Sequence, residues 1–477
     1  MNKTIAIIIA LILFIGVIFQ ALVIVDYHSD EFNPGFFRKM ENPVVYFESF
    51  DEAIANQFFK PFDIYLRDGS LTWIVRKDED LFNTLWEDGK SVLIDALSDE
   101  LKNSTLTWAE LSEKPGILFK MGCDFPTEFI SFLSNEDIES PSAKTMDRLL
   151  VIPSDGVMEV YIKSGRDVLF TSALTPKGLF TTTNFNGLLD LFAVDPYYSQ
   201  NSYTEIHKFV SADVLDEFIE PDIPVTLDIN SRNLPWLKLS LPTPVRDYID
   251  SANSSDDEAK AAGIEEAAAI IKSKIISRTL NTYEMHIDSF DNLFFSNQFN
   301  IYEVSKAGWI SYNYTEGAEG DGRGDIGTAF MNAVETLGNV MRLSDNSANL
   351  YLSDLKVYDD SYEFFFDYRF KGSVLVMEQS SHAMEIKATA TRTIEANIYP
   401  LNIEEMTGDQ YIDSRYKTAF LFITNFNGIT NINTIEASNM YLGYVKTDAR
   451  LEVVKPVWVI ELQNGAKQVL DLVEAGE

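Results

Sequence analysis

The feature that most constrains the fold of this chain is an apolar run near its N-terminus, residues 5–25. At a rise of about 1.5 Å per residue, a helix over this run is about 30 Å long, the thickness of a bilayer's hydrocarbon core. Its one polar side chain is Gln20, and Gly16 lies one turn earlier. We therefore expect residues 1–26 to form a short cytoplasmic tail and a single transmembrane anchor.

Charges on either side of the run predict its orientation. Lys3 precedes the run, whereas Asp26, Asp30 and Glu31 follow it. Positively charged flanks stay in the cytoplasm, so the N-terminus is expected inside and the remaining chain outside. A cleaved signal peptide would have a shorter apolar region ending in a small-residue site, and the run shows neither. The expected location is the cell membrane, crossed once, with an extracytoplasmic ectodomain.

Charge and cysteine content narrow the class of protein. The formal net charge is −35, from 73 acidic and 38 basic residues, which argues against nucleic acid as a partner because phosphate binding needs a basic surface. The single cysteine, Cys123, cannot form an internal disulfide. Packing must therefore stabilise the exported part, as in many Gram-positive exported proteins. Cys123 follows an apolar stretch and is expected to be a core thiol rather than a nucleophile.

The pattern of short strands and helices predicts an α+β fold: a three-domain ectodomain of antiparallel sheets with packed helices. After a linker over 27–40, we expect an N-terminal domain at 41–205, a central domain at 206–345 and a C-terminal domain at 346–477.

Individual segments make this expectation concrete. Helical spacing predicts helices over residues 79–102 and 326–343, and residues 254–257 are expected to cap a long helix over 256–277. A further helix is expected near 408–422. Five successive runs of the C-terminal domain are expected to form an antiparallel meander: Asn349 to Tyr358, Tyr362 to Phe370, Ser373 to Glu378, Ala383 to Ala390 and Arg392 to Tyr399.

Beyond the anchor, three stretches have a recognisable order and spacing. The first is Asp124-Phe125-Pro126-Thr127-Glu128-Phe129 with Met146-Asp147-Arg148-Leu149-Leu150-Val151-Ile152. The second is Phe364 to Val374 with Ala383-Met384-Glu385-Ile386 and Ile398-Tyr399-Pro400. The third is Tyr441-Leu442-Gly443-Tyr444-Val445 with Val453 to Glu461. With the anchor, this order resembles the YycH family of extracytoplasmic regulators and, more distantly, YycI.

The resemblance covers nearly the whole chain and carries functional expectations. It implies an ectodomain without catalysis and a protein that acts on the membrane sensor histidine kinase WalK (YycG), together with a YycI-like single-pass protein. That two-component system governs cell-wall metabolism. The resemblance does not imply whether the kinase is activated or restrained. Two departures fall in the central domain, namely the helix over 256–277 and the longer Gly320 to Asp325 turn.

No constellation in the sequence indicates catalysis. The four histidines, His28, His207, His286 and His382, are scattered outside any metal-binding spacing, and no nucleophile elbow, phosphate-binding loop or dinucleotide fingerprint is present. We therefore expect no enzyme, no cofactor and no resident metal. The acidic loop 316–325 lacks the final Glu of an EF-hand loop, and a solvated turn is preferred there over a Ca²⁺ site.

Gly16 and Gln20 are the candidate site residues, because they share one face of the anchor four positions apart. Gln20 can hydrogen-bond a neighbouring helix, with Gly16 allowing close approach, or it can simply reach the membrane interface. The leading hypothesis is a non-enzymatic regulator of a sensor kinase acting through this helix and the ectodomain. The alternative is a cell-wall-facing binding or structural module unconnected to a kinase, and an exported hydrolase is disfavoured.

Overall fold

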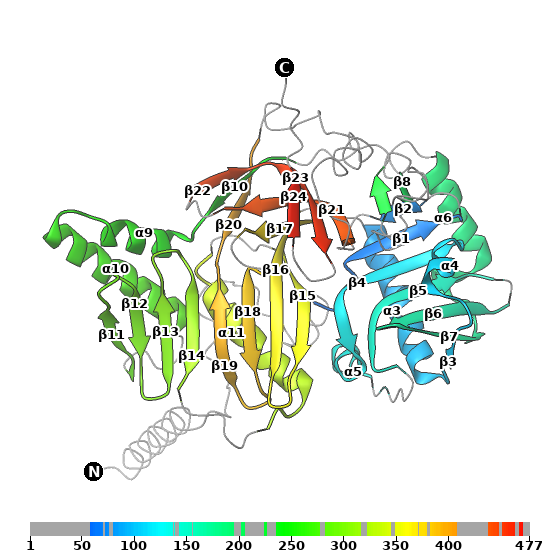
Figure 1. Cartoon of the computed structure of the whole chain (residues 1–477), viewed down its shortest axis with the longest axis horizontal. Coiled ribbons are helices and arrows are strands. Elements are labelled where there is room, and N and C mark those ends of the chain that lie inside the picture. The colour runs from blue at the N-terminus through cyan, green and yellow to red at the C-terminus, as the bar shows by residue number, and fades with distance from the viewer. Residues whose placement is uncertain are drawn as a thin grey trace, which may run out of the picture. The chain divides into compact units, whose positions relative to one another are not determined.

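The computed structural model is a mixed α+β structure built of antiparallel sheets with packed helices, as the sequence predicts (Figure 1). Among the strand pairs of the described residues, all are antiparallel except β17 with β21. Within that part of the chain, no helix combines the length and apolarity needed to cross a bilayer. The structure describes residues 58–69, 72–75, 80–136, 138, 143–154, 156–194, 202–205, 224–226, 235–276, 282–315, 322–344, 349–370, 372–378, 382–407, 437–447, 451–462 and 467–470.

The first sheet comes from the N-terminal part of the chain. Within the described residues it has nine strands, in the order β3-β7-β6-β5-β4-β1-β2-β8-β9. Its strands are β1 (Asp63–Arg67), β2 (Thr72–Val75), β3 (Lys102–Asn103), β4 (Gly116–Pro126), β5 (Thr145–Ile152), β6 (Met158–Ser164), β7 (Asp167–Leu174), β8 (Ser202–Glu205) and β9 (Pro224–Thr226). Its helices are α3 (Asp80–Ser98), α4 (Trp108–Ser112), α5 (Thr127–Ser134) and α6 (Thr182–Val194), with the 3-10 turn η2 (Gly178–Phe180).

Helix α3 packs on this sheet through an aromatic stripe. Phe82, Leu85, Trp86 and Leu93 are fully or almost fully buried in the main core. At Gly89 the helix comes so close that an added Cβ would lie 2.5 Å from the Phe119 ring. The helix predicted over 79–102 is therefore confirmed, with a close approach that its periodicity did not reveal.

A second, larger sheet is built from strands between residues 284 and 470. In the described residues it has twelve strands, ordered β11-β12-β13-β14-β19-β18-β16-β17-β21-β23-β24, with β15 paired to β16. They are β11 (Glu284–Ile287), β12 (Leu293–Ser296), β13 (Asn300–Val304), β14 (Ile310–Tyr314), β15 (Asn349–Val357), β16 (Tyr362–Phe370), β17 (Ser373–Met377), β18 (Met384–Ala388), β19 (Thr393–Ile398), β21 (Ala437–Lys446), β23 (Pro456–Leu462) and β24 (Lys467–Leu470). A small sheet joins β10 (Leu237–Ser240) to β20 (Asn402–Glu405) and β22 (Leu451–Val454).

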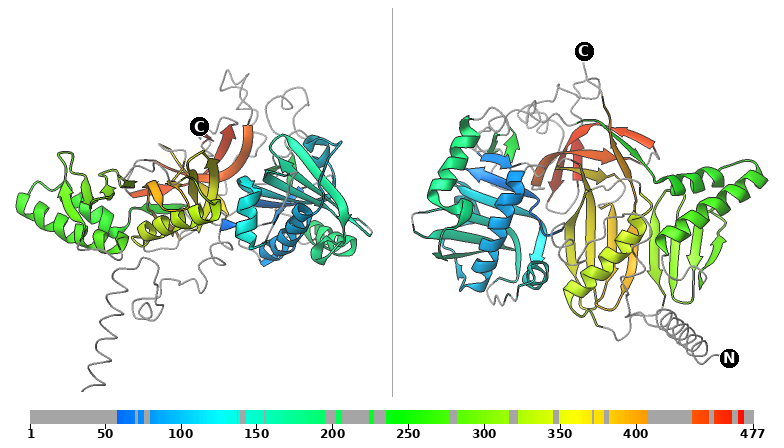
Figure 2. Two further views of the ribbon diagram at one scale, coloured as in Figure 1. Left: turned by 90° about the horizontal axis from the view of Figure 1, so that it is seen from below. Right: turned by 180° about the vertical axis from the view of Figure 1, so that it is seen from behind.

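Three helices accompany the larger sheet. Helix α11 (Ile326–Met341) lies along one face over β16, β18 and β19, as the view from behind shows (Figure 2). Helices α9 (Thr243–Ala252) and α10 (Asp257–Ile275) pack on each other, and their buried side chains share a core with β12 and β13. Asp256 caps α10 by accepting hydrogen bonds from two backbone amides, which confirms the predicted start of that helix.

The expected meander is wrong at one point. The two halves of β16 have different partners: β17 pairs with Tyr368 to Phe370, and β18 pairs with Tyr362 to Phe366. Strand β17 then pairs in parallel with β21 instead of antiparallel with β18. A nine-residue strand can hold two short neighbours end to end on one edge, which the local alternation of the sequence cannot reveal.

Strand pairs cross both of the domain boundaries predicted from the sequence. Across 205/206, β8 pairs with β9. Strand β14 pairs with β19, and β10 pairs with both β20 and β22, so residues 237–314 share sheets with residues 393–454. The boundaries at 205/206 and 345/346 stay predictions. The anchor predicted over 5–25 and the helix predicted near 408–422 lie outside the described residues.

Candidate interaction site

Neither of the two site residues predicted from the sequence lies in the part of the chain that the structure describes. Gly16 and Gln20 lie outside the described residues, as do His28 and His207. Trp309 packs against the main core and meets Tyr399 edge to face with ring centroids 5.0 Å apart.

The loop predicted over 316–325 is described from Gly322 onward. The Asp325 carboxylate accepts hydrogen bonds from the amides of Gly327 and Thr328 and so caps α11. The Arg323 guanidinium lies 5.5 Å from the ring centroid of Tyr362. Among the described residues, no three His, Cys, Asp or Glu side chains gather as metal ligands would. At its described end, this loop therefore fastens α11 to the sheet.

Cys123 lies on β4, next to Gly122, whose Cα approaches β15 closely: a Cβ there would lie 2.6 Å from the Leu352 carbonyl oxygen. The Cys123 side chain is partly buried against the main core. Burial raises the pKa of its thiol well above the ordinary value, and the nearby carboxylates of Asp354 and Asp124 raise it further. A thiol that stays protonated is a poor nucleophile, which supports the predicted core role.

A serine, a histidine and an aspartate meet where β17 and β18 diverge from β16. His382 Nδ1 lies 2.9 Å from Asp367 Oδ2 and 3.0 Å from Ser353 Oγ. A catalytic relay needs the acid and the nucleophile on opposite ring nitrogens, whereas here both contacts fall on the same nitrogen. Ser353 also donates to the Phe365 carbonyl at 3.1 Å. The trio therefore fixes strands rather than activating the serine.

Asp367 is the centre of this trio and is 1% exposed. Burial alone would raise the pKa of its carboxyl. The hydrogen bond from His382, the charge of Lys467 3.9 Å away and the Ala383 amide together outweigh burial and hold that pKa below its ordinary value. The charged Asp367 side chain thus links β16, on which it lies, to the start of β18 and to β24.

Three exposed apolar side chains lie close together at the β11 end of the larger sheet. Met285 and Ile287 on β11 are 44% and 39% exposed, and Phe290 in the following turn is 75% exposed. Met285 and Ile287 stand opposite the fully buried Phe295 and Leu293 of β12, and therefore point to the core face of the sheet. They extend the hydrophobic core to the rim of the molecule.

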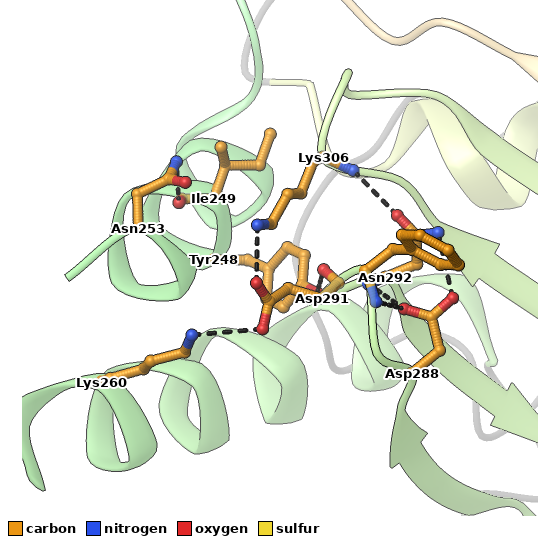
Figure 3. A network of polar contacts seen from close by, with 9 residues as sticks. Tyr248, Ile249, Asn253, Lys260, Asp288, Asp291, Asn292 and Lys306 are labelled. Atoms are coloured by element: carbon orange, nitrogen blue, oxygen red, sulfur yellow. Dashed lines mark hydrogen bonds and ion pairs between the residues drawn. The ribbon is translucent and has the colours of Figure 1, made fainter. Parts of the chain in front are cut away.

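The turn between β11 and β12, residues 288–292, is held by a dense polar network (Figure 3). The Asp288 carboxylate accepts hydrogen bonds from the amides of Phe290 and Asn292, both at 2.8 Å. Asp291 has a φ of 58°, a left-handed conformation that few non-glycine residues adopt. We refer to residues 288–292 as the Asp291 turn.

Neighbouring elements converge on this turn. Lys306, from the β13–β14 connection, and Lys260, from α10, bind opposite oxygens of the Asp291 carboxylate at 2.6 and 3.1 Å. Their hydrogen bonds lower the pKa of Asp291, with the Lys306 bond having the larger effect. Tyr248 of α9 donates to the Asp291 carbonyl oxygen (Figure 3). The exposed Phe290 is therefore carried on a rigidly held backbone.

Sequence reasoning missed this surface. The hairpin was not predicted because the run that forms β12 (Leu293-Phe294-Phe295-Ser296) was not recognised as a strand. Asp288, Asp291 and Asn292 between two apolar runs are a turn signal that could have located it. The chemistry of the site is that of binding: an exposed strand edge, apolar side chains and no cluster of reactive groups.

The whole architecture resembles that of a known protein structure. No protein-family model matches the sequence, and no curated protein matches it. The crystal structure of YycH from Bacillus subtilis superposes with a TM-score of 0.51 and 10% identity, covering 88% of this chain and 97% of that chain. The similarity extends over the N-terminal sheet and the larger sheet together, since so little of either chain is left out. The chain therefore has a YycH-like fold.

Proposed function

We propose that this protein is a membrane-anchored, non-enzymatic regulator of a sensor histidine kinase of the WalK (YycG) type, acting in the control of cell-wall metabolism. The observation that carries the proposal is the likeness to YycH over 88% of the chain. The apolar run over 5–25 with its charge asymmetry supports it, because a regulator of a membrane kinase needs a place beside that kinase.

The anchor is the proposed working surface within the membrane. A neighbouring helix shifts the balance between two kinase states only if it contacts those states differently. Gly16 would allow close approach of the helices, and Gln20 would form a hydrogen bond across them, with a contribution of about 1 kcal/mol. A YycI-like single-pass protein is the proposed companion. The ectodomain would set the position of the anchor or report on the wall.

The proposal is tested by exchanging the anchor. Residues 5–25 are replaced by an unrelated transmembrane helix of equal length, and kinase output is read from a promoter under the control of its response regulator. A change in output with unchanged protein level is expected. If the exchanged chain regulates the kinase as well as the original does, the intramembrane mechanism is wrong.

Single substitutions sharpen the test. Gln20→Leu and Gly16→Leu are expected to alter output, because both change the proposed contact face. Ile18→Leu is the matched control, since Ile18 lies about 200° around the helix from both residues. If none of these variants changes output and the full chain instead binds purified peptidoglycan, the wall-facing binding module is the better account.

A further inference from the structure

Strand β11 forms an open edge of the larger sheet. In the part of the chain that the structure describes, it pairs only with β12, and all four of its residues, Glu284–Ile287, are exposed. We call this strand the β11 edge. It lies at one end of the sheet, beside α10 (Figure 1).

The backbone of the β11 edge has hydrogen-bonding groups that face outward. The Asp288 amide donates to the Asn292 carbonyl, so residues 288 and 292 form a hydrogen-bonded pair. Because such pairs alternate in an antiparallel ladder, the amides and carbonyls of Met285 and Ile287 point away from β12. These are the groups that an added strand would bind.

The edge is held in an extended form at both ends. At one end, Lys272 of α10 donates to the Tyr283 carbonyl at 2.7 Å. At the other, the Asp291 turn is fixed by Asp288, Lys260, Lys306 and Tyr248. A strand that is already ordered loses little conformational entropy when another strand binds to it.

The sequence of β11 lacks several of the features that stop an open edge from pairing with another strand. Proteins commonly guard an open edge with lysine, proline, a bulge, a charged side chain or a very short strand. β11 (Glu284-Met285-His286-Ile287) is short and begins with a charged residue, but it contains no lysine or proline and pairs without a register shift. Its two faces also differ. Met285 and Ile287 are apolar on one face, whereas Glu284 lies on the other face, where His286 stacks on Phe294 at 4.9 Å.

The charge near β11 indicates which kind of segment would bind there. Exposed Glu284 begins the strand, in a chain with a net charge of −35. Asp288 follows the apolar pair, but its carboxylate already accepts hydrogen bonds from the amides of Phe290 and Asn292. Directly opposite residues on adjacent strands share a face, so apolar side chains suit positions opposite Met285 and Ile287, and a cation suits the position opposite Glu284. A second copy of this chain would bring a second acidic surface and is disfavoured.

We propose that the β11 edge binds an extended segment of another protein in which apolar and basic residues alternate, adding it to the sheet as a further strand. The backbone groups of Met285 and Ile287 provide the hydrogen bonds, and Met285, Ile287 and Phe290 provide the apolar contact. This goes beyond the proposed kinase regulation and does not depend on it, because it concerns the ectodomain alone.

The test uses the full chain in phosphatidylcholine nanodiscs and three fluorescent ten-residue peptides, followed by anisotropy. One peptide alternates Lys and Val, the second alternates Glu and Val, and the third is the Lys–Val peptide with N-methyl groups that block both edges. We expect the Lys–Val peptide to bind at least about tenfold more tightly than either of the others. Equal binding of the N-methylated peptide would show attraction by charge alone and would overturn the proposal, as would equal binding of the Glu–Val peptide.

A matched pair of variants locates the binding on β11. Ile287→Pro removes one outward amide without touching the β11–β12 ladder, whereas Ile287→Val keeps that amide. Binding of the Lys–Val peptide is expected to fall about tenfold in the first and to be unchanged in the second, with the thermal midpoint of both recorded. Unchanged binding to a folded Ile287→Pro chain places the site elsewhere. A dimer of the full chain that Ile287→Pro dissociates would instead make a second copy the occupant, against the proposal.

Because proline itself could unfold the edge, the comparison of the two Lys–Val peptides on the unsubstituted chain remains the decisive measurement. It alters only the peptide backbone and leaves this protein intact. The kinase output of Ile287→Pro separates the two proposals: lost peptide binding with normal output leaves the anchor mechanism standing.

Discussion

At the scale of single residues, Arg369 is a buried cation that ties two sheets. Its side chain is 3% exposed, its Nη1 donates to the Phe62 carbonyl at 2.7 Å, and its guanidinium lies 3.6 Å from the centroid of the Phe62 ring. Asp63 Oδ1 is 3.7 Å from its Nη2. These contacts connect β16 with Phe62 and Asp63 at the start of β1. Arg369 therefore links the larger sheet to the first sheet.

Arg369→Ala is expected to lower the free energy of unfolding by about 3 kcal/mol, because it removes a buried hydrogen bond, a cation–π contact and side-chain volume. Arg369→Lys should recover only part of this loss, since an ammonium cannot stack as a planar group does. Urea denaturation of the full chain measures both. Arg392→Ala is the matched control: Arg392 stacks on Tyr314 at 4.4 Å in a partly exposed position, and about 0.5–1 kcal/mol is expected. Equal losses at the two sites would contradict the assigned role of Arg369.

Asp367 gives a pH dependence whose sign follows from its lowered pKa. A carboxyl whose pKa is lower in the folded state stabilises the fold fully above its unfolded pKa of about 3.9, and this stabilisation is lost as pH falls through the lower, folded value. The difference in unfolding free energy between the original chain and Asp367→Asn is therefore expected to be constant above about pH 5 and to shrink below about pH 4. Urea titrations between pH 7 and pH 3 measure it. A difference that grows on acidification would show that the pKa of Asp367 is raised instead.

At the scale of elements, alanine substitutions at two helix glycines distinguish the effect of packing on stability from that of helix propensity. In α3, a Cβ on Gly89 would collide with the Phe119 ring, whereas on Gly338 in α11 it would meet nothing within 4 Å. Gly89→Ala is expected to destabilise the chain by about 1–3 kcal/mol through overpacking, although alanine is the better helix former. Gly338→Ala should stabilise it by about 0.5–1 kcal/mol. Thermal unfolding of the two variants gives the comparison, and a stabilised Gly89→Ala would show that α3 stands further from β4.

The same scale shows what the sequence could and could not predict. Helices α3 and α11 were found from their helical spacing, and α10 from its capping residues and its Ala-, Glu- and Lys-rich composition. The observed bounds of all three are close to those expected. Helices α6 and α9 were missed. Helix α9 has a Pro at its start and only ten residues, so its periodic signal is short. The forked pairing of β16 was also missed, because strand partners are chosen by contacts far away in the sequence.

The candidate site was harder to predict than the fold. A sequence shows that Phe290 is apolar, but its 75% exposure depends on how Asp288, Lys260 and Lys306 hold the turn. Two of these contacts come from outside the hairpin. Gly16 and Gln20 stay predictions: they were selected because a bilayer's thickness sets the length of an apolar helix expected to cross it.

At the scale of the whole molecule, the larger sheet determines which parts of the chain depend on each other. Strand β14 borders β19, and β10 lies between β20 and β22, so the segment 206–345 takes strand partners from the segment 346–477. The nine strands described in the first sheet all come from residues 63–226. Residues 63–226 therefore contain all the described strands of their sheet, whereas residues 206–345 depend on strands from residues 346–477.

This difference predicts the behaviour of fragments. A fragment of residues 54–226 keeps every described partner of its sheet and is expected to show a cooperative urea transition, weakened by the loss of the Arg369 contact. A fragment of residues 206–345 loses the partners of β10 and β14 and leaves new open edges, so it is expected to lack a cooperative transition and to associate. Circular dichroism with urea and size-exclusion chromatography test both fragments, and a fragment of residues 235–477 is the control that restores the missing strands. A cooperative, monomeric 206–345 fragment would mean that the central segment folds alone, and that its hydrogen bonds to β19, β20 and β22 form only after each part is already folded.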